Sequence, residues 1–133
     1  MQLNLSTDIA LRTLIYLGQK GEPATIAEIA KAFDIVRTHL MKVVMALVAA
    51  GLVSSVRGRN GGILLAREAR AIRVGEVVEL METSMALVFC MKDGTTNDAC
   101  PLLPAAACAN CFSRRRNLFL PRSTKARWPI CCR

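Results

Sequence analysis

The chain has 133 residues, 53% of them hydrophobic, and a formal net charge of +8. This length holds one modest domain with an extension, and so apolar a composition excludes disorder throughout. No N-terminal segment combines a basic start, an apolar run and a small-residue cleavage site, and the uncharged run 43–56 is too short to cross a bilayer. We therefore expect a cytoplasmic protein with no membrane partner.

The positive charge is concentrated in the tail. Residues 1–108 hold eleven Lys or Arg and ten Asp or Glu, which leaves a balance of only +1. From residue 109 onward there is no acidic residue, and seven bases occur. Total charge is thus a poor guide to a nucleic-acid partner, and the positions of individual bases must decide. The seven are Arg114, Arg115, Arg116, Arg122, Lys125, Arg127 and Arg133.

The first helix is expected to begin near Thr7, with Thr7 or Ser6 as its N-cap and Asp8 close to the positive helix end. Gly18 and the Gly21–Pro23 segment are expected to end it. Its apolar stripe has near-helical spacing and consists of Ile9, Leu11, Leu14, Ile15 and Leu17.

Two further helices follow, separated by a break at residues 33–35. Thr25 and Glu28 have the spacing of a capping box, which predicts a helix start at that point. The next helix should run from Val36 to about Ala49 and end at Gly51. A short helix, a tight turn and a longer helix form a helix-turn-helix. The expected buried face of the second helix is Leu40, Val43, Val44, Leu47 and Val48.

A basic, glycine-rich hairpin comes next. Residues 53–56 and 63–65 are short strand candidates on either side of the loop 57–62, whose sequence is Arg-Gly-Arg-Asn-Gly-Gly. A further amphipathic helix lies around Val77–Met81. The sequence therefore predicts a mainly α, winged helix-turn-helix domain over residues 1–82 with a two-stranded wing. A cysteine-bearing loop over 83–108 and an atypical basic tail over 109–133 follow, and we expect the tail to be irregular and poorly ordered.

Arg37, Thr38 and His39 fall at the start of the expected recognition helix, and Lys42 lies one turn further on. Residues at this end of such a helix reach base edges in the major groove, where Arg pairs well with guanine. Lys42 is better placed for a phosphate. A solvated helix face with one incidental histidine is the alternative interpretation.

Arg57 and Arg59 lie at the tip of the expected wing. Glycines there let the backbone approach a phosphate or the narrow minor groove, in which Arg is favoured. The alternative is an ordinary hairpin with solvated arginines. Together with the preceding helices, the loop favours double-stranded DNA as the partner.

Cys90, Cys100 and Cys108 are separated by nine and seven residues. Thiolates on a loop with Gly, Asp and Pro can hold an iron–sulfur cluster. Spacing alone equally allows three unrelated cysteines, and Cys108 with Cys111 is half of a zinc knuckle without a second pair. In a reducing compartment, six cysteines favour metal binding or redox chemistry over a disulfide framework.

Five segments, 1–3, 7–17, 37–43, 56–62 and 71–78, resemble the Rrf2 family of winged-helix repressors, and within it the nitric-oxide-sensing NsrR branch. The resemblance covers residues 1 to about 105. It implies a homodimer that represses promoters and carries an iron–sulfur cluster, of 2Fe–2S or 4Fe–4S type, modified by nitric oxide or oxidants.

The same resemblance implies a ligand set for the cluster. Cys90 and Cys100 match its first two cysteines, and Asp8 matches an acidic residue that completes the cluster from the other subunit. The family's third cysteine falls where this chain has Ala106, so Cys108, two residues later, is the candidate for that position. For Asp8 the alternative role is that of a carboxylate at a helix start.

The tail departs from the family from about residue 106. The family continues into a long dimerisation helix, whereas this tail has no acidic residue, two prolines and no apolar stripe, so we expect it to dimerise poorly. Codons for Trp128-Pro129-Ile130-Cys131-Cys132, grouped to begin one base earlier, permit Val-Ala-Asp-Leu-Leu, which matches the ending of that helix. We hypothesise a shift of reading frame near residue 105, by sequencing error or mutation; a divergent but genuine tail is the alternative.

The sequence thus predicts a DNA-binding transcriptional regulator, a repressor controlled by an iron–sulfur cluster. One alternative is a cluster-free regulator that responds to a small molecule. Another is a metal- or thiol-sensing module that uses its helices for protein contact. An enzyme is not expected, because no nucleophile–base pair or pair of carboxylates accompanies the lone histidine.

Overall fold

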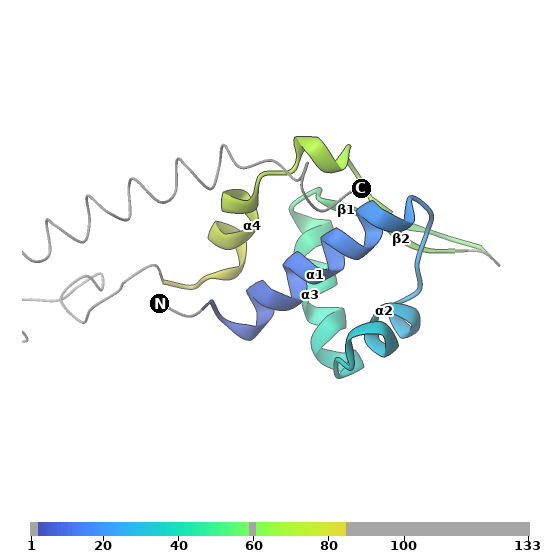
Figure 1. The fold of residues 1–133 in the computed structure, drawn as a ribbon, viewed down its shortest axis with the longest axis horizontal. Coiled ribbons are helices and arrows are strands. Elements are labelled where there is room, and N and C mark those ends of the chain that lie inside the picture. The colour runs from blue at the N-terminus through green and yellow to red at the C-terminus, as the bar shows by residue number, and fades with distance from the viewer. Residues whose placement is uncertain (1–2, 59–60, 85–133) are drawn as a thin grey trace, which may run out of the picture.

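A computed structural model describes residues 3–58 and 61–84 of the chain. Four α-helices and an antiparallel hairpin make up this part, so the predicted mainly α, winged helix-turn-helix fold is confirmed (Figure 1). The tail 109–133 and all but the first two residues of the cysteine loop 83–108 lie outside the described residues. In chain order the elements are α1 (Leu5–Lys20), α2 (Ile26–Phe33), α3 (Arg37–Ala49), β1 (Val53–Val56), β2 (Gly62–Leu65), a 3-10 turn (Ala69–Ala71) and α4 (Val74–Met81).

Helix α1 begins two residues earlier than the sequence suggests. Its N-cap is Asn4, whose side-chain oxygen accepts a hydrogen bond from the Thr7 backbone N–H at 2.8 Å. The prediction that Thr7 or Ser6 caps the helix is wrong, because both lie within the first turn. The helix ends at Lys20, after which Gly21 adopts a left-handed conformation with φ of 69°.

The helix-turn-helix forms as predicted. Thr25 and Glu28 make both bonds of a capping box, which satisfies two backbone donors at the start of α2. Asp34 ends that helix in the left-handed region with φ of 53°, and the Ile35 N–H then donates to the Ala30 carbonyl at 2.9 Å. Asp tolerates this conformation better than most residues, so a tight turn is possible without glycine.

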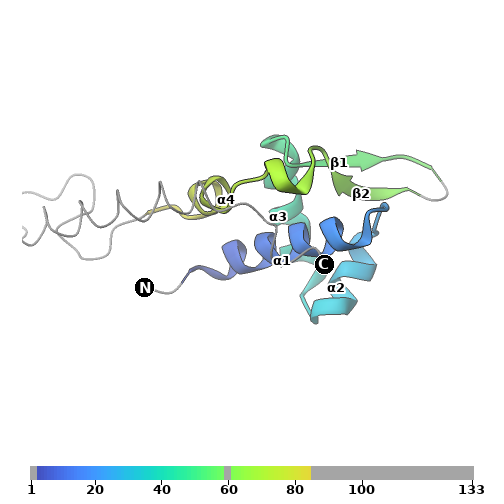
Figure 2. The same ribbon diagram turned by 45° about the horizontal axis from the view of Figure 1, so that its top comes forward.

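The hairpin is tied to the start of α2 as well as to itself. Strands β1 and β2 pair in the register Val53↔Leu65 to Val56↔Gly62, and Ala24 forms an additional bridge with Ile63. Two backbone hydrogen bonds of 2.9 and 2.8 Å join Ala24 to Ile63. The approach is so close that a Cβ on Gly62 would lie 2.5 Å from the Ala24 carbonyl oxygen. From this base the hairpin extends away from the helices (Figure 2).

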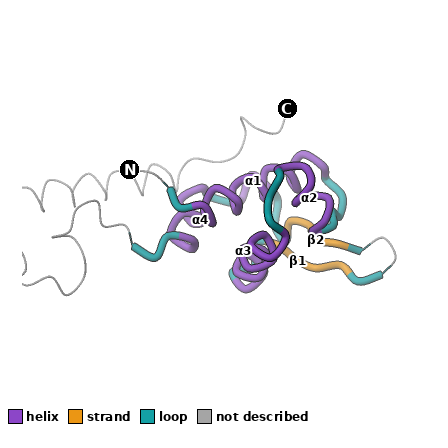
Figure 3. The backbone as a smooth tube through the Cα atoms, turned by 90° about the horizontal axis from the view of Figure 1, so that it is seen from below, coloured by secondary structure: helices purple, strands orange, loops and turns teal. Residues whose placement is uncertain are grey.

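The core lies between the four helices α1 to α4 and the base of the hairpin, and α3 runs beside the strands (Figure 3). The prediction for the buried face of α3 holds for four of its five residues. Val48 is wrong, because its side chain is 40% exposed and lies on the side of α3 that faces the hairpin. Of the expected α1 stripe, Leu11 and Ile15 are only partly buried. The largest fully buried apolar side chains are Ile9, Ile29, Leu40, Leu47, Leu52, Ile72, Val53, Val77 and Val78.

In the described part of the chain, no helix has both the length and the apolar character needed to cross a membrane.

Candidate nucleic-acid interface

Helix α3 presents an exposed basic start. Arg37 and Thr38 occupy its first turn and Lys42 follows one turn later, and all three are solvent-exposed. They are exposed because the opposite side of the helix, including Leu40 and Leu47, is fully buried in the core. The three side chains can therefore reach a ligand without any rearrangement of the domain.

His39 is placed differently from its neighbours. It is half-buried, and its Nε2 atom lies 3.1 Å from the Ser6 hydroxyl oxygen of α1, with which it shares a hydrogen bond. This contact fastens the start of α3 to the first turn of α1. This pair could not be predicted from the sequence, because the two residues are 33 positions apart.

The same turn of α1 is joined to the end of α4. The Glu82 carboxylate accepts hydrogen bonds from the Asn4 backbone N–H at 2.9 Å, the Asn4 side-chain amide at 3.1 Å and the Thr7 hydroxyl at 2.6 Å. The Asn4 amide also donates to the Met81 carbonyl at 2.9 Å. We call Asn4, Thr7 and Glu82 the clasp. Thr7 is fully buried, whereas Asn4 and Glu82 are partly buried, so the clasp lies at the edge of the core.

The wing is held in a narrow turn next to Arg57. The Gly61 N–H donates to the Gly58 carbonyl at 3.0 Å, and Gly58 has a φ of 121°, which favours glycine. A Cβ on Gly61 would lie 2.4 Å from the Val56 carbonyl oxygen. Arg57 itself is exposed. Arg59, the other predicted contact, lies outside the described residues.

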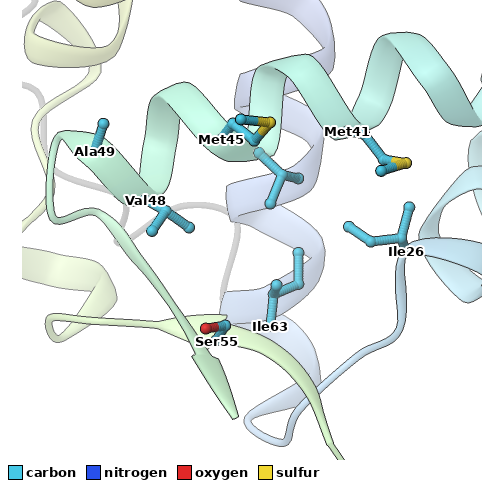
Figure 4. Close-up of a pocket in the computed structure, with 8 residues that line it drawn as sticks. Ile26, Met41, Met45, Val48, Ala49, Ser55 and Ile63 are labelled. Atoms are coloured by element: carbon cyan, nitrogen blue, oxygen red, sulfur yellow. The ribbon is translucent and has the colours of Figure 1, made fainter. Parts of the chain in front are cut away.

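One pocket shows that α3 and the hairpin border a common surface. It has a volume of about 430 Å³, and its walls are almost entirely apolar. Figure 4 shows Met41 and Val48 extending from α3 toward Ile26 and the strands. This apolar surface was not predicted from the sequence. The lining residues are Ile26, Met41, Val44, Met45, Val48, Ala49, Ser55 and Ile63.

The segment that forms α3 and the hairpin carries charge of one sign. No Asp or Glu occurs between Asp34 and Glu68, a stretch that contains α3 and the whole hairpin. The five bases in this stretch are Arg37, Lys42, Arg57, Arg59 and Arg67. Arg67 is paired with Glu76 of α4 at 2.7 Å. Three other bases of this stretch lie in the described residues: Arg37, Lys42 and Arg57. Within those residues, none of the three forms an ion pair with an acidic side chain. An uncompensated basic surface attracts a polyanion.

Glu28 joins α2 to the end of α1. Its Oε1 atom accepts hydrogen bonds from the Tyr16 hydroxyl at 2.8 Å and from Lys20 Nζ at 2.5 Å. The bonds from Lys20 and then Tyr16 lower the pKa of the Glu28 carboxyl, and the same contacts raise the pKa of Lys20 and of Tyr16. This network fixes the first helix of the helix-turn-helix against α1.

Little of the predicted cluster site falls in the described residues. Asp8 is there, and it pairs with Arg12 one turn later at 2.9 Å with both side chains partly exposed. Cys90, Cys100 and Cys108 lie outside the described range. Within residues 3–58 and 61–84, no group of three His, Cys, Asp or Glu side chains is close enough to hold a metal ion.

Several solved structures share this fold. "T. potens IscR" superposes with a TM-score of 0.73 and 21% identity, over 96% of this chain and 82% of the other. The oxidized form of Staphylococcus aureus CymR gives 0.72 and 22%, over 96% and 92%. CymR, described as the global cysteine regulator of B. subtilis, gives 0.62 and 23%, over 86% and 88%. At these identities the likeness shows a common fold.

The family is shown by a separate match. The model of the Rrf2 family, described as an iron-dependent transcriptional regulator, matches residues 3–120. The match runs past residue 105, at which the resemblance in the sequence ends, and so includes part of the tail. With the winged helix-turn-helix in place and most of the chain matched, the protein belongs to the Rrf2 family of transcriptional regulators.

Proposed function

We propose that the protein is a repressor that binds operator DNA through α3 and the wing. Arg37 and Thr38 read base edges in the major groove, while Lys42, Arg57 and Arg59 hold the backbone or the adjacent minor groove. His39, whose Nε2 is engaged by Ser6, contributes by fixing the start of α3 beside them. A homodimer would set two such helices about one duplex turn apart, ~10 bp.

The observation that carries this proposal is the set of exposed cations on α3 and the hairpin, two elements that contain no acidic residue. These cations lie on the two elements that a winged helix uses to contact DNA, and a buried core holds α3 in place. A protein partner would have to match a row of cations with carboxylates, whereas duplex DNA supplies the charge in every sequence.

Fluorescence anisotropy with labelled duplexes over a salt series tests the DNA contacts. Arg37→Ala should weaken binding roughly tenfold at the preferred site, since a bidentate contact to guanine is lost. Arg70, exposed on the 3-10 turn outside the proposed surface, is the matched control, and Arg70→Ala should stay within about twofold. Equal losses of affinity in the two variants, or an affinity that does not change with salt concentration, would refute the assignment of Arg37 as a DNA contact.

We further propose that an iron–sulfur cluster controls this binding in response to nitric oxide or redox state. Cys90, Cys100 and Cys108 would supply three thiolates, the donors that such clusters require, and Asp8 a carboxylate. The thiolate donor set fits the group. Asp8 is partly exposed, and its bond to Arg12 would have to open for it to serve as a ligand.

Anaerobic purification with quantification of iron and sulfide, followed by operator binding before and after nitric oxide, tests this second part. A protein that contains iron and sulfide and releases DNA on nitric oxide treatment is the expected result. Salt-dependent operator binding by a protein free of iron and sulfide would instead establish a cluster-free regulator. If the protein contains iron but binds no duplex, the result would support the alternative of a metal- or thiol-sensing module that contacts proteins.

A further inference from the structure

Three large apolar side chains are exposed on α3 beside its basic residues. Met41 is 47% exposed, Met45 is 69% exposed and Val48 is 40% exposed. Apolar groups in such a continuous patch on a soluble domain mark a contact surface, because water solvates them poorly. The patch continues into the apolar pocket against Ile26 and Ile63 (Figure 4).

Helix geometry places the patch on the same face as the cations. Met41 follows Arg37 by four residues, and Met45 follows Lys42 by three and Thr38 by seven. Side chains at these separations are neighbours on a helix surface. A ligand bound to Arg37 and Lys42 would therefore lie beside the two methionines.

The charges around the apolar patch indicate which kind of partner binds it. Neither α3 nor the hairpin carries an acidic residue, so the surface suits a partner with anionic groups outside and small apolar groups within reach of the helix. In the major groove of DNA the exposed apolar group is the 5-methyl of thymine. Methionine is well suited to contact it, because its unbranched thioether adapts its shape to the group it covers.

We propose that Met41 and Met45 are specificity-determining residues that contact thymine methyl groups in the operator. This inference rests on the proposed DNA-binding function and adds to it a chemical preference that the charged residues do not supply. Thymines at fixed positions beside the base contacted by Arg37 are then recognised through their methyl groups.

Operator duplexes selected from a random library by the full-length protein provide the probe. Each thymine in the selected site is replaced in turn by deoxyuridine, which removes only the methyl group and leaves base pairing unchanged. We expect roughly fourfold weaker binding at one or two positions, the effect of losing one buried methyl contact.

Variants then assign the methyl contacts. In Met41→Ala and in Met45→Ala, deoxyuridine should no longer weaken binding at the thymine that the replaced methionine contacts. In Met45→Leu, deoxyuridine should still weaken binding there. Leu80→Ala is the matched control, because Leu80 is an equally apolar side chain, 40% exposed, on α4 rather than α3. Its sensitivity to deoxyuridine should equal that of the wild type.

Two outcomes overturn the inference while the DNA-binding function stands. One is specific binding, dependent on Arg37, that no deoxyuridine substitution weakens. The other is a deoxyuridine effect that persists in both alanine variants, which would assign the methyl contact to another group. Failure to select any duplex would instead refute the DNA-binding function itself.

Discussion

Removing the carboxylate of the clasp should destabilise the domain strongly. In Glu82→Ala the Asn4 backbone N–H, the Asn4 amide and the Thr7 hydroxyl each lose an acceptor. A hydrogen bond to a charged group contributes about 1.5–3 kcal/mol. The three do not simply add, since Thr7 keeps the Asn4 side-chain oxygen at 3.1 Å and the Asn4 amide keeps the Met81 carbonyl. Asn4 is also only partly buried, so that water replaces part of what is lost.

The expected cost is therefore about 2–3 kcal/mol in the free energy of unfolding. For a domain of this size such a loss lowers Tm by roughly 10 °C or more. Urea denaturation of the full-length protein, followed by circular dichroism, measures the change. Glu79→Ala is the control, because Glu79 is an exposed carboxylate on the same helix. If the two variants unfold within about 0.5 kcal/mol of each other, the clasp contributes nothing and the reasoning fails.

Two further predictions follow from other contacts, and two from the sequence of the tail. Gly62→Ala should destabilise the hairpin by about 1–3 kcal/mol, since the added Cβ meets the Ala24 carbonyl oxygen at 2.5 Å; unchanged urea denaturation would contradict this. Because the pKa of Glu28 is lowered in the folded chain, its stabilising effect is complete above its unfolded-state pKa and is lost as pH falls through its folded-state pKa. Glu28→Gln should therefore flatten the pH dependence of stability in acid, and parallel curves for the two proteins would refute that assignment. Resequencing the gene around codon 105 should reveal a lost or gained base, and an intact reading frame would refute this. Sedimentation of the 133-residue protein should show weak dimerisation, and a tight dimer would refute that expectation.

Short-range signals in the sequence predicted most of the helices and the wing. Thr25 and Glu28 specify a helix start by their spacing alone, and Gly21 and Gly51 mark positions where the backbone must turn left-handed. The exposure of Arg37, Lys42 and Arg57 also followed from pattern, because the apolar residues of the same elements had to face the core.

The contacts that were missed depend on residues far apart in the chain. Asn4, Ser6 and Thr7 are all acceptable N-caps, and the choice of Asn4 is stabilised by Glu82, which is 78 positions away. Val48 looks like a core residue until the hairpin is placed, and the pocket around Met41 needs both α2 and β2. Arg59, Cys90, Cys100 and Cys108 lie outside the described residues, and the roles assigned to every DNA contact and cluster ligand remain predictions.

The first turn of α1 is a shared anchor for the two ends of the domain. It holds Glu82, where the chain leaves α4 toward the cysteines, and through Ser6 it holds His39 at the start of α3. An event that withdrew the Glu82 carboxylate would loosen that turn, and with it the contact that positions the start of α3. The linkage is reciprocal, so a duplex that steadies α3 would slow hydrogen exchange at the Asn4 backbone amide.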